Sequence, residues 1–368
     1  MALKVLLAPY FDGNQYLDML DAHLNQQDVE TTHESHSHPL WPLAVDALRN
    51  NINVIHLHWT HPYFLLGNYS DFERLPFSWL LSAFFAFAFV AQVWLCSYLD
   101  IRIVWTVHNR CNHERRHESI DHWVSRRIVG IADAVQVWDE RTEQELEAYL
   151  GTPLDNIIRI PHGNYAPLYS PTDRDRETCR RELDLDPKKR TFLYFGRIRP
   201  YKQVPELLRT WCDLEPSNAQ LMIAGNSKDE KTTQTIESLA ADRDDVVLDI
   251  RYIPDKDLPR YFGACDVAVF PYQDIFNSGS VLLAMTFGRP FVAPRLGAIP
   301  SVDPGGNILY DPDDGLGSAL ERAVQTVRSD LDEVGEQNRS TALDHYDWKD
   351  VTVDLISVYR GEALEVQR

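Results

Sequence analysis

Two segments in the second half of the chain carry residues that suit a bound phosphate group. In the first, an apolar run at residues 191–195 is followed by Gly196 and Arg197, and Lys202 comes five residues after the arginine. Because ligands of α/β domains bind at the carboxyl ends of the strands, both cations are expected at such an edge. A charge-assisted hydrogen bond to a phosphate contributes about 1.5 to 3 kcal/mol. The pair therefore predicts a diphosphate site, with two solvated surface cations as the alternative.

The second segment is the turn Asn277-Ser278-Gly279-Ser280, which leads into an apolar helical run at residues 281–287. Small polar residues at a helix N-terminus offer backbone N–H groups, hydroxyl groups and the positive end of the helix dipole, all of which suit a diphosphate. The lysine of a Walker motif does not occur in this turn. For the turn taken alone, a plain Ser or Asn helix cap is the alternative.

The first half of the chain holds the candidates for acid–base chemistry. His108 follows an apolar run at 101–107, His113 and Glu114 come five and six residues later, and Asp12 lies in the first turn. A reaction in which a hydroxyl group attacks needs a general base. Glu114 and Asp12 are the candidates for that base, and a solvated loop is the alternative for His113 and Glu114.

Short apolar runs that alternate with helical patterns must position these residues. In the first half a helical pattern at 15–24 follows the first of the runs, which lie at 3–8, 52–57, 101–107, 134–137 and 157–160. A polar stretch at 166–190 precedes a second series at 191–195, 220–224, 246–249, 267–270 and 291–293. Alternation of this kind is typical of parallel strands joined by crossover helices.

We therefore predict an α/β protein with two Rossmann-like, doubly wound domains that face a cleft. A chain of 368 residues is long enough for two such cores. The predicted limits are an N-terminal, acceptor-side domain at 1–165, a linker at 166–190, a second domain at 191–340, and a C-terminal helix at 341–368 that docks back toward the first domain.

Composition excludes some partners. The chain has 35 Asp and 20 Glu against 28 Arg and 8 Lys, a net charge of -19. The absence of a basic face argues against a nucleic-acid partner, and an anionic small ligand would need a local basic pocket. The excess of Asp and Arg is typical of a salt-adapted cytoplasm, with an ordinary acidic protein as the alternative. Five scattered cysteines and a short apolar N-terminus predict a cytoplasmic protein that is not secreted.

The segment at 76–99 has no charged residue and by length alone qualifies as a membrane span. The apolar runs at 52–57 and 101–107 flank it directly, and if both belong to one sheet, a span would place them on opposite sides of the bilayer. We favour a buried or partly exposed crossover helix. A helix that also leans into a membrane surface through residues 77–95 is the second interpretation, and a true span is the third.

Several histidines and aspartates invite a metal site, which we do not predict. His56 and His58 alternate along one run, and His33, His36 and His38 lie close together, but no Cys or carboxylate follows with matching spacing. Asp-x-Asp pairs such as Asp173/Asp175 and Asp255/Asp257 are expected by chance in so acidic a chain.

Together the segments resemble the C-terminal domain of GT-B glycosyltransferases, especially family 4 and its relatives that build lipid-linked glycans and exopolysaccharides. The shared features are Gly-Arg with Lys five residues after the Arg, then Ala224-Gly225-Asn226, then the run Ala-Met-Thr-Phe-Gly-Arg-Pro-Phe-Val-Ala at 284–293. In the first half, Trp-Thr-Val-His-Asn at 105–109 and Ile-Pro-His-Gly-Asn at 160–164 are similar to two further family segments. The resemblance covers nearly the whole chain.

The chain departs from family 4 at two positions. Typical members have a Glu just before the Ala-Met pair and another eight residues earlier, whereas these positions hold Leu283 and Ile275 here. The contacts that those carboxylates make with the donor sugar and ribose are therefore missing, and relatives with a small-polar turn are the closer match. Whether the reaction retains or inverts configuration is left open.

The resemblance implies a hexosyltransferase that needs neither a metal ion nor a cofactor. Its donor is expected to be a UDP-, GDP- or dTDP-sugar, and its acceptor a glycan or a polyprenyl- or dolichol-linked glycan. His108 is expected to contact the donor sugar. Further residues near the donor nucleotide and sugar are Gly13, Asn14, Gly225, Asn226 and Tyr252. Acceptor-side residues are His58, His113 and His162. A nucleotide-sugar epimerase of the same shape and a non-catalytic partner subunit are the alternatives, and a cytoplasmic protein peripheral to the inner face of the membrane is the expected location.

Overall fold

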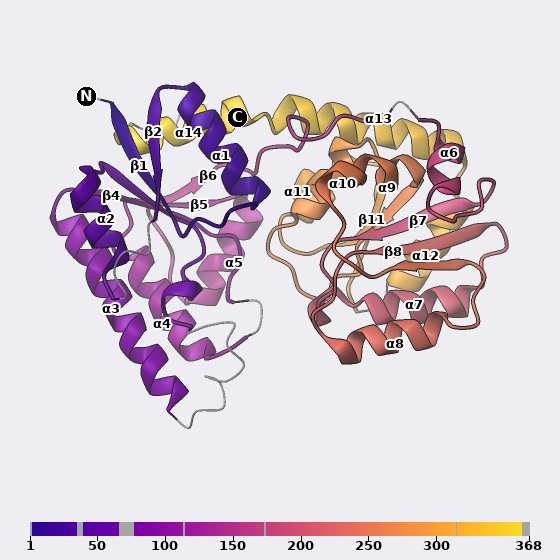
Figure 1. The fold of residues 1–368 in the computed structure, drawn as a ribbon, viewed down its shortest axis with the longest axis horizontal. Coiled ribbons are helices and arrows are strands. Elements are labelled where there is room, and N and C mark those ends of the chain that lie inside the picture. The colour runs from indigo at the N-terminus through magenta and orange to yellow at the C-terminus, as the bar shows by residue number, and fades with distance from the viewer. Residues whose placement is uncertain are drawn as a thin grey trace. The chain divides into compact units, whose positions relative to one another are not determined.

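The computed structural model describes residues 2–34, 40–65, 77–112, 115–172, 174–313 and 315–362. The chain forms two compact units. Unit 1 comprises residues 1–163 with 348–368, and unit 2 comprises residues 164–347. In the described residues, each unit has a parallel sheet of six strands with helices on both faces (Figure 1). Sheets covered on both faces need apolar side chains on both sides of each strand, which explains the continuous apolar runs in the sequence.

The sheet of unit 1 has the strand order β2-β1-β3-β4-β5-β6. Its strands are β1 (Leu3–Ala8), β2 (Val29–His33), β3 (Val54–Leu57), β4 (Arg102–Thr106), β5 (Ala134–Val137) and β6 (Ile157–Arg159). The direction of winding reverses between β1 and β3. Ligands of open α/β sheets bind at such a switch point, outside the carboxyl ends of the strands.

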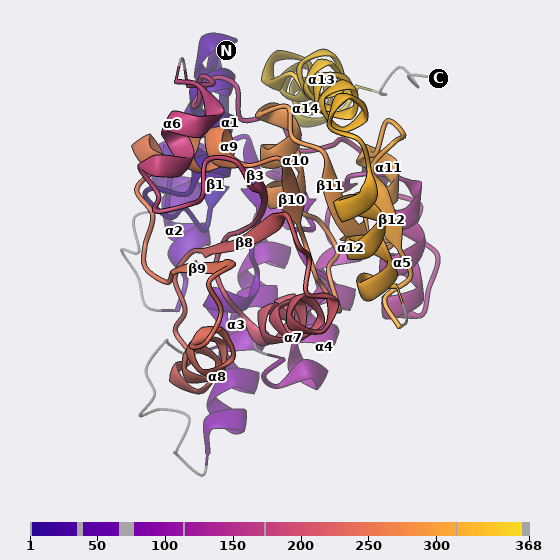
Figure 2. The ribbon, with the colours of Figure 1, turned by 90° about the vertical axis from the view of Figure 1, so that its right-hand side faces the viewer.

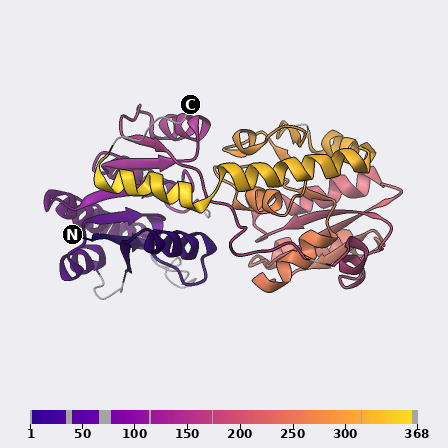
Figure 3. The same cartoon turned by 90° about the horizontal axis from the view of Figure 1, so that it is seen from above.

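Helices cover both faces of this sheet. One face carries α1 (Gln15–Gln26) and α14 (Trp348–Arg360), which pack on each other (Figures 1 and 3). The other face carries, side by side, α2 (Pro42–Asn50), α3 (Ser78–Tyr98), α4 (Glu118–Val129) and α5 (Glu140–Leu150). Trp348 and Leu355 of α14 are buried in the same core as Val5 and Leu17, so the last helix is an integral part of unit 1.

The sheet of unit 2 has the strand order β12-β11-β10-β7-β8-β9. Its strands are β7 (Arg190–Phe195), β8 (Ala219–Ala224), β9 (Val246–Asp249), β10 (Val267–Val269), β11 (Phe291–Pro294) and β12 (Ile308–Tyr310). On one face lie α7 (Val204–Leu214), α8 (Glu230–Ala240) and α12 (Leu316–Gln325), and on the other α6 (Arg176–Arg181), α9 (Leu258–Ala264), α10 (Gly279–Thr286) and α13 (Arg328–His345) (Figures 1 and 2). The short helix α11 (Ile299–Val302) joins β11 and β12, and single 3-10 turns form at η1 (His61–Tyr63), η2 (Pro200–Lys202) and η3 (Asp255–Asp257).

The predicted fold class, two doubly wound α/β domains, is confirmed. The predicted runs all correspond to strands, and the structure adds β2, β12 and α13, which the sequence patterns did not indicate. The stretch predicted as a linker, 166–190, lies within unit 2 and contains α6. The predicted C-terminal helix at 341–368 is divided: its first residues finish α13 in unit 2, and α14 belongs to unit 1.

Helix α3 is a crossover between two neighbouring strands. It is long and apolar enough to cross a membrane by length and composition, but β3 and β4, which it joins, pair in parallel in one sheet. A spanning helix would place these strands on opposite sides of a bilayer, so the topology contradicts the interpretation as a true span. The strand pairing does not bear on whether the outer surface of α3 contacts a membrane.

Candidate functional site

Two glycines bring the ends of β7 and β8 close together in unit 2. Gly196 and Gly225 have φ angles of +135° and +138°, which favour glycine. A Cβ atom on Gly225 would lie 2.0 Å from the carbonyl oxygen of Gly196, so no side chain fits there. The backbone N–H of Gly196 donates to the carbonyl of Ala224 at 3.1 Å. The strand ends therefore leave bare backbone at the carboxyl edge of the sheet.

Both predicted segments meet above Gly196. A Cβ atom on Gly196 would lie 3.4 Å from Lys202 Nζ and 3.5 Å from Ser280 Oγ, so the ammonium group and the hydroxyl group flank the same glycine. Lys202 ends η2, and its Nζ lies 5.2 Å from the centre of the Tyr272 ring. The strand-edge rule predicted the place of the two cations, and the family resemblance joined them with the turn at 277–280.

The cations at this edge have no carboxylate partner. Arg197 is exposed and Arg199 is half-buried, and within the described residues neither these side chains nor Lys202 forms an ion pair. Burial, and then the neighbouring charges of Arg199 and Arg197, lower the pKa of Lys202 to about 7. In a chain with 55 acidic and 36 basic residues, a cluster of three cations without an ion pair in the described residues is unusual, although Asp274 lies near the neighbouring Tyr201. A bound dianion would supply a counter-charge and would favour the protonated lysine.

The N-terminus of α10 completes the edge. Ser278 caps the helix by accepting a hydrogen bond from the N–H of Val281 at 3.3 Å, and among the described residues no acceptor is found for the N–H groups of Gly279 and Ser280. A Cβ atom on Gly279 would lie 2.6 Å from the hydroxyl oxygen of Tyr165, so a larger residue here would have to displace the end of that side chain. Asn277 stands half-buried before the cap. The arrangement can hold two phosphates with N–H donors, a hydroxyl group and cations.

The two positions of the missing carboxylates are apolar and buried. Ile275 is 9% exposed and Leu283 is 6% exposed. Gly225 serves the close approach of the two strands, and the carbonyl of Asn226 accepts from the N–H of Ile198 at 2.8 Å. Tyr252, predicted near the donor nucleotide, follows β9 and is exposed.

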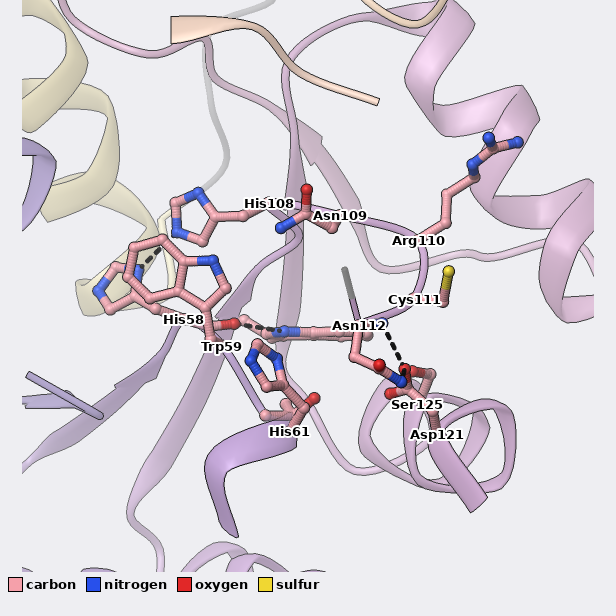
Figure 4. A pocket seen from close by; sticks show the side chains of 12 residues that line it. His58, Trp59, His61, His108, Asn109, Arg110, Cys111, Asn112, Asp121 and Ser125 are labelled. Carbon is pink, nitrogen blue, oxygen red and sulfur yellow. Dashed lines mark hydrogen bonds between the residues drawn. The ribbon is translucent and has the colours of Figure 1, made fainter. Parts of the chain in front are cut away.

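In unit 1, the ends of β3 and β4 bring two imidazoles together. His58 Nδ1 and His108 Nε2 lie 3.2 Å apart and share a hydrogen bond (Figure 4). The indole of Trp59 stacks on the His108 ring with centres 4.2 Å apart, and Tyr16 meets the same ring edge-on at 4.8 Å. Burial, and then the neighbouring imidazoles, lower the pKa of His58 well below its usual range. His58 is therefore neutral, and its Nδ1 helps to position His108; its predicted acceptor-side role stays a prediction.

His56 has a structural role. Thr106 Oγ1 donates to Gln136 Oε1 at 2.5 Å and therefore accepts from His56 Nε2 at 2.7 Å, which leaves His56 Nδ1 to accept from the hydroxyl of Tyr359 at 2.6 Å. Burial lowers the pKa of His56 to about 3. Both nitrogens are engaged, so the alternation of His56 and His58 reflects a buried polar network.

A pocket opens beside the imidazole pair (Figure 4). The 12 residues that line it come from the ends of β3 and β4 and from α4: His58, Trp59, Thr60, His61, Trp105, His108, Asn109, Arg110, Cys111, Asn112, Asp121 and Ser125. Asp121 accepts from the N–H and the Nδ2 of Asn112 at 2.6 and 2.9 Å, which fixes the loop after β4. Burial raises the pKa of Asp121, against the hydrogen bonds from Asn112.

The remaining predicted residues of unit 1 are dispersed. Gly13 has a positive φ angle in the turn before α1, and Asn14 caps α1 by accepting from the N–H groups of Tyr16 and Leu17, so its side chain is already engaged. Asp12 is exposed. His162 is 6% exposed within an aromatic cluster that includes Trp348, and burial lowers its pKa to about 4; its acceptor-side role stays a prediction. His113 and Glu114 lie outside the described residues.

Within the described parts of the chain, no three His, Cys, Asp or Glu side chains are grouped to hold a metal ion. Asp175 of one Asp-x-Asp pair caps α6 by accepting from the N–H of Thr178 at 2.8 Å, and Asp255 and Asp257 lie in η3. His36 and His38 lie outside the described residues.

Residues 189–330 match the family model described as glycosyl transferases group 1. A similar protein is the GDP-mannose:glycolipid 4-beta-D-mannosyltransferase of Xanthomonas campestris, 27% identical over 72% of this chain and 69% of its own length. Another is the D-inositol 3-phosphate glycosyltransferase of Corynebacterium glutamicum, 26% identical over 63% of this chain and 58% of its own length.

Solved structures share the fold. The sucrose-phosphate synthase of Thermosynechococcus elongatus matches 98% of this chain and 99% of its own with a TM-score of 0.75 at 17% identity. The Anabaena protein HepE, solved with UDP and glucose, matches 98% of this chain and 100% of its own with a TM-score of 0.68 at 14% identity. Both are GT-B structures, so the predicted GT-B fold is confirmed.

Proposed function

We propose that this chain, a glycosyltransferase with a glycosyl transferases group 1 domain at residues 189–330, transfers a hexose from a nucleoside-diphosphate sugar, held by unit 2, to a lipid-linked glycan. The observation that carries the proposal is the meeting of Lys202 and Ser280 above Gly196, with Arg197 beside them and no carboxylate partner for these cations among the described residues. This site needs a dianion.

The donor site acts on the leaving group. When the bond between the sugar and the diphosphate breaks, negative charge grows on the diphosphate, and Lys202, Arg197 and the N–H groups of Gly279 and Ser280 stabilise it. These groups are fixed before the reaction, because the close approach of Gly225 to Gly196 and the cap at Ser278 hold the backbone in place. We propose that the reaction needs no metal ion and no cofactor, since cations and N–H donors supply the positive charge.

Unit 1 supplies groups for the sugar and the acceptor. We assign His108 to the donor sugar, with its ring held by His58 and Trp59. The pocket beside it offers the indole of Trp59 as a flat surface for a sugar ring of the acceptor. Asp12 and Glu114 stay the proposed general bases if configuration is inverted.

The relatives guide the choice of substrates. The Xanthomonas relative is named for GDP-mannose and a glycolipid, which supports GDP-mannose as the first donor to test, ahead of UDP- and dTDP-sugars, and a polyprenyl- or dolichol-linked glycan as acceptor. We further propose that the protein works in a salt-adapted cytoplasm, peripheral to the inner face of the membrane, where such acceptors are exposed.

The test is transfer itself. The purified protein is incubated with each donor and a polyprenyl-diphosphate-linked oligosaccharide, and the lipid product and the released nucleoside diphosphate are measured by mass spectrometry. The loss of a charge-assisted hydrogen bond predicts that Lys202→Met weakens donor binding about tenfold to a hundredfold. Lys188→Met removes an exposed lysine just before the opposite end of β7 and should bind the donor like the wild type.

Two other results would replace the proposal. Conversion of the donor into an isomer without any acceptor would indicate an epimerase. A protein whose melting temperature does not respond to UDP, GDP or dTDP would indicate a subunit without a donor site, since ligand at 100 times its Kd should stabilise by about 2.7 kcal/mol.

A further inference from the structure

Helix α3 presents a long apolar stripe to solvent. The stripe consists of Phe77, which precedes the helix, and the residues Leu80, Phe84, Phe87, Trp94 and Tyr98. These six side chains are between 56% and 72% exposed, and they recur at intervals of three, four and seven residues, which places them on one face. No residue of the helix is charged. A monomeric soluble protein rarely exposes such a continuous surface.

The opposite face of α3 is fixed in unit 1. Ser82, Ala86, Phe89, Val93 and Cys96 are buried, and α3 packs between α2 and α4 on the sheet. The inner face of α3, which has no Trp, is therefore already packed against the rest of unit 1. A helix held along its length in this way cannot cross a bilayer, but its outer face can lie parallel to one.

The helices beside α3 are positively charged at their surfaces. Arg49 of α2 and Arg126 and Arg127 of α4 are exposed, and within the described residues none of them has a carboxylate partner. Glu118, in the first turn of α4, is the exposed acid of these two helices, since Asp46 and Asp121 are buried. An uncharged aromatic stripe between two arginine-bearing helices matches the acyl region and the anionic headgroups of a bilayer.

Charge also decides between a bilayer and a second copy of the chain. Two α3 faces packed about a twofold axis would bring helices with unpaired arginines against each other, because both flanking helices carry them. Coiled-coil seams favour aliphatic residues with charged residues beside them, and α3 has aromatic residues and no charge. Trp94 and Tyr98 near one end and Trp79 near the other are the amphipathic aromatic residues typical of membrane interfaces.

We infer that α3 docks unit 1 on an anionic lipid bilayer, lying flat with the stripe in the outer acyl region and Arg49, Arg126 and Arg127 at the headgroups. This inference deepens the proposed function, because a lipid-linked acceptor is reached from the bilayer surface.

Contacts connect this surface to the pocket. Tyr63, in the turn that follows the pocket residues Trp59 to His61, stacks on Phe89 of α3 with centres 4.6 Å apart. Asp121 and Ser125, which also line the pocket, lie on α4, the neighbour of α3. Helix α3 is about 31 Å long, whereas strand β3, which precedes it in the chain, is about 13 Å long. The helix therefore extends well beyond this strand. Docking through α3 therefore holds the pocket at a fixed place relative to the headgroups.

The experiment is flotation of the purified full chain with vesicles, without donor or acceptor. Vesicles of phosphatidylcholine alone are compared with vesicles that contain phosphatidylglycerol. We expect the wild type to float with the anionic vesicles. The double variant Phe84→Ser/Phe87→Ser should lower the partition coefficient about tenfold or more, since two apolar side chains leave the bilayer. Arg126→Glu/Arg127→Glu should lower binding to the anionic vesicles and leave binding to neutral ones unchanged.

Matched controls keep the result interpretable. Val327→Ser changes an equally exposed apolar residue in unit 2 and should float like the wild type. All variants are first compared by circular dichroism and melting temperature, which should not change because the substituted side chains face solvent.

Three outcomes would overturn the inference. They are a wild type that stays in solution with both kinds of vesicle, a Phe84→Ser/Phe87→Ser variant that still floats fully, and a dimer in light scattering that only this variant dissociates. Because flotation needs no catalysis, failure of sugar transfer in the separate assay would leave this result standing, and the reverse holds as well.

Discussion

The depressed pKa of Lys202 makes donor binding depend on pH in a way that can be calculated. With a pKa of about 7 in the empty site, most Lys202 side chains are protonated at pH 6 and about one in eleven is protonated at pH 8. A diphosphate binds the protonated form, so each bound donor at pH 8 draws a proton from solution. The apparent Kd should therefore be about tenfold higher at pH 8 than at pH 6, which corresponds to about 1.4 kcal/mol.

The ligand must not titrate in the same range. A nucleoside diphosphate has a terminal phosphate with a pKa near 6, whereas both phosphates of a nucleoside-diphosphate sugar are diesters and keep a constant charge. Isothermal titration calorimetry with the sugar nucleotide, in buffers of different ionisation enthalpy, gives both the Kd and the number of protons taken up. We expect about half a proton at pH 7 and about 0.9 at pH 8 for a pKa of about 7.

Lys202→Arg is the decisive control, because guanidinium keeps its charge throughout this range. The variant should bind the donor with no proton uptake and a nearly constant Kd between pH 6 and pH 8. A wild type that takes up no proton, or a Lys202→Arg variant with the wild-type pH slope, would refute the argument that burial and neighbouring arginines hold Lys202 near neutrality.

Three further predictions concern stability and the backbone of the donor site. Asp266→Asn should lower the free energy of unfolding by about 3 to 5 kcal/mol in urea titrations, because Asp266 pairs with the buried Arg180 and accepts from the N–H of Thr191 at 2.7 Å. His56 and His162 have pKa values of about 3 and 4 in the folded protein, against about 6.5 when unfolded. The unfolded state therefore binds more protons below pH 6.5, and each histidine should lower the free energy of unfolding by about 2 kcal/mol between pH 7.5 and pH 5. A free energy of unfolding that does not change over this pH range would contradict their burial in neutral form. Gly225→Ala should abolish the response of the melting temperature to donor, because its Cβ atom would meet the Gly196 carbonyl, and normal donor binding by this variant would show that the close approach is not needed.

Ten of the twelve strands in the described residues could be predicted because they are short apolar runs, and the central ones, such as β3, β5 and β8, are buried along their whole length. β2 escaped notice because it is an edge strand with the polar sequence Val-Glu-Thr-Thr-His. Helix α13 escaped notice because its buried residues, Leu331, Gly335, Asn338 and Ala342, are mostly small or polar. In both cases the element is stabilised by its neighbours more than by its own pattern.

The stretch at 166–190 was predicted as a linker because its composition is polar, whereas in the structure it lies within unit 2. Arg180 of α6 is almost fully buried, where it donates to Asp266 and to the carbonyl of Ala264. These partners lie more than 80 residues further along the chain. Local composition predicts a solvated linker, whereas a contact over that distance makes the stretch part of the core of unit 2.

The same distinction applies to the candidate site. Arg197 and Lys202 could be placed because the ends of parallel strands gather at one edge, and the turn at 277–280 because small polar residues precede an apolar helical run; neither rule needs knowledge of distant contacts. The role of His56 could not, because it depends on Tyr359, which lies 303 residues away. Sequence patterns thus locate groups that follow strand ends, but not the partners that decide whether a histidine is buried or available.

In both units, a group of cations forms no ion pair within the described residues, and the same physical reason can explain both groups. Many arginines of this acidic chain have a carboxylate close by, as in the pairs Arg159–Glu143 and Arg243–Asp245. Clusters of cations that form no ion pair within the described residues stand out against this background, because acids outnumber bases in the chain. One cluster surrounds the backbone edge at Gly196, and the other flanks the uncharged stripe of α3. A carboxylate paired with either cluster would compete with an external anion. The lack of such ion pairs among the described residues therefore supports the two proposals, a donor diphosphate in unit 2 and lipid headgroups at unit 1.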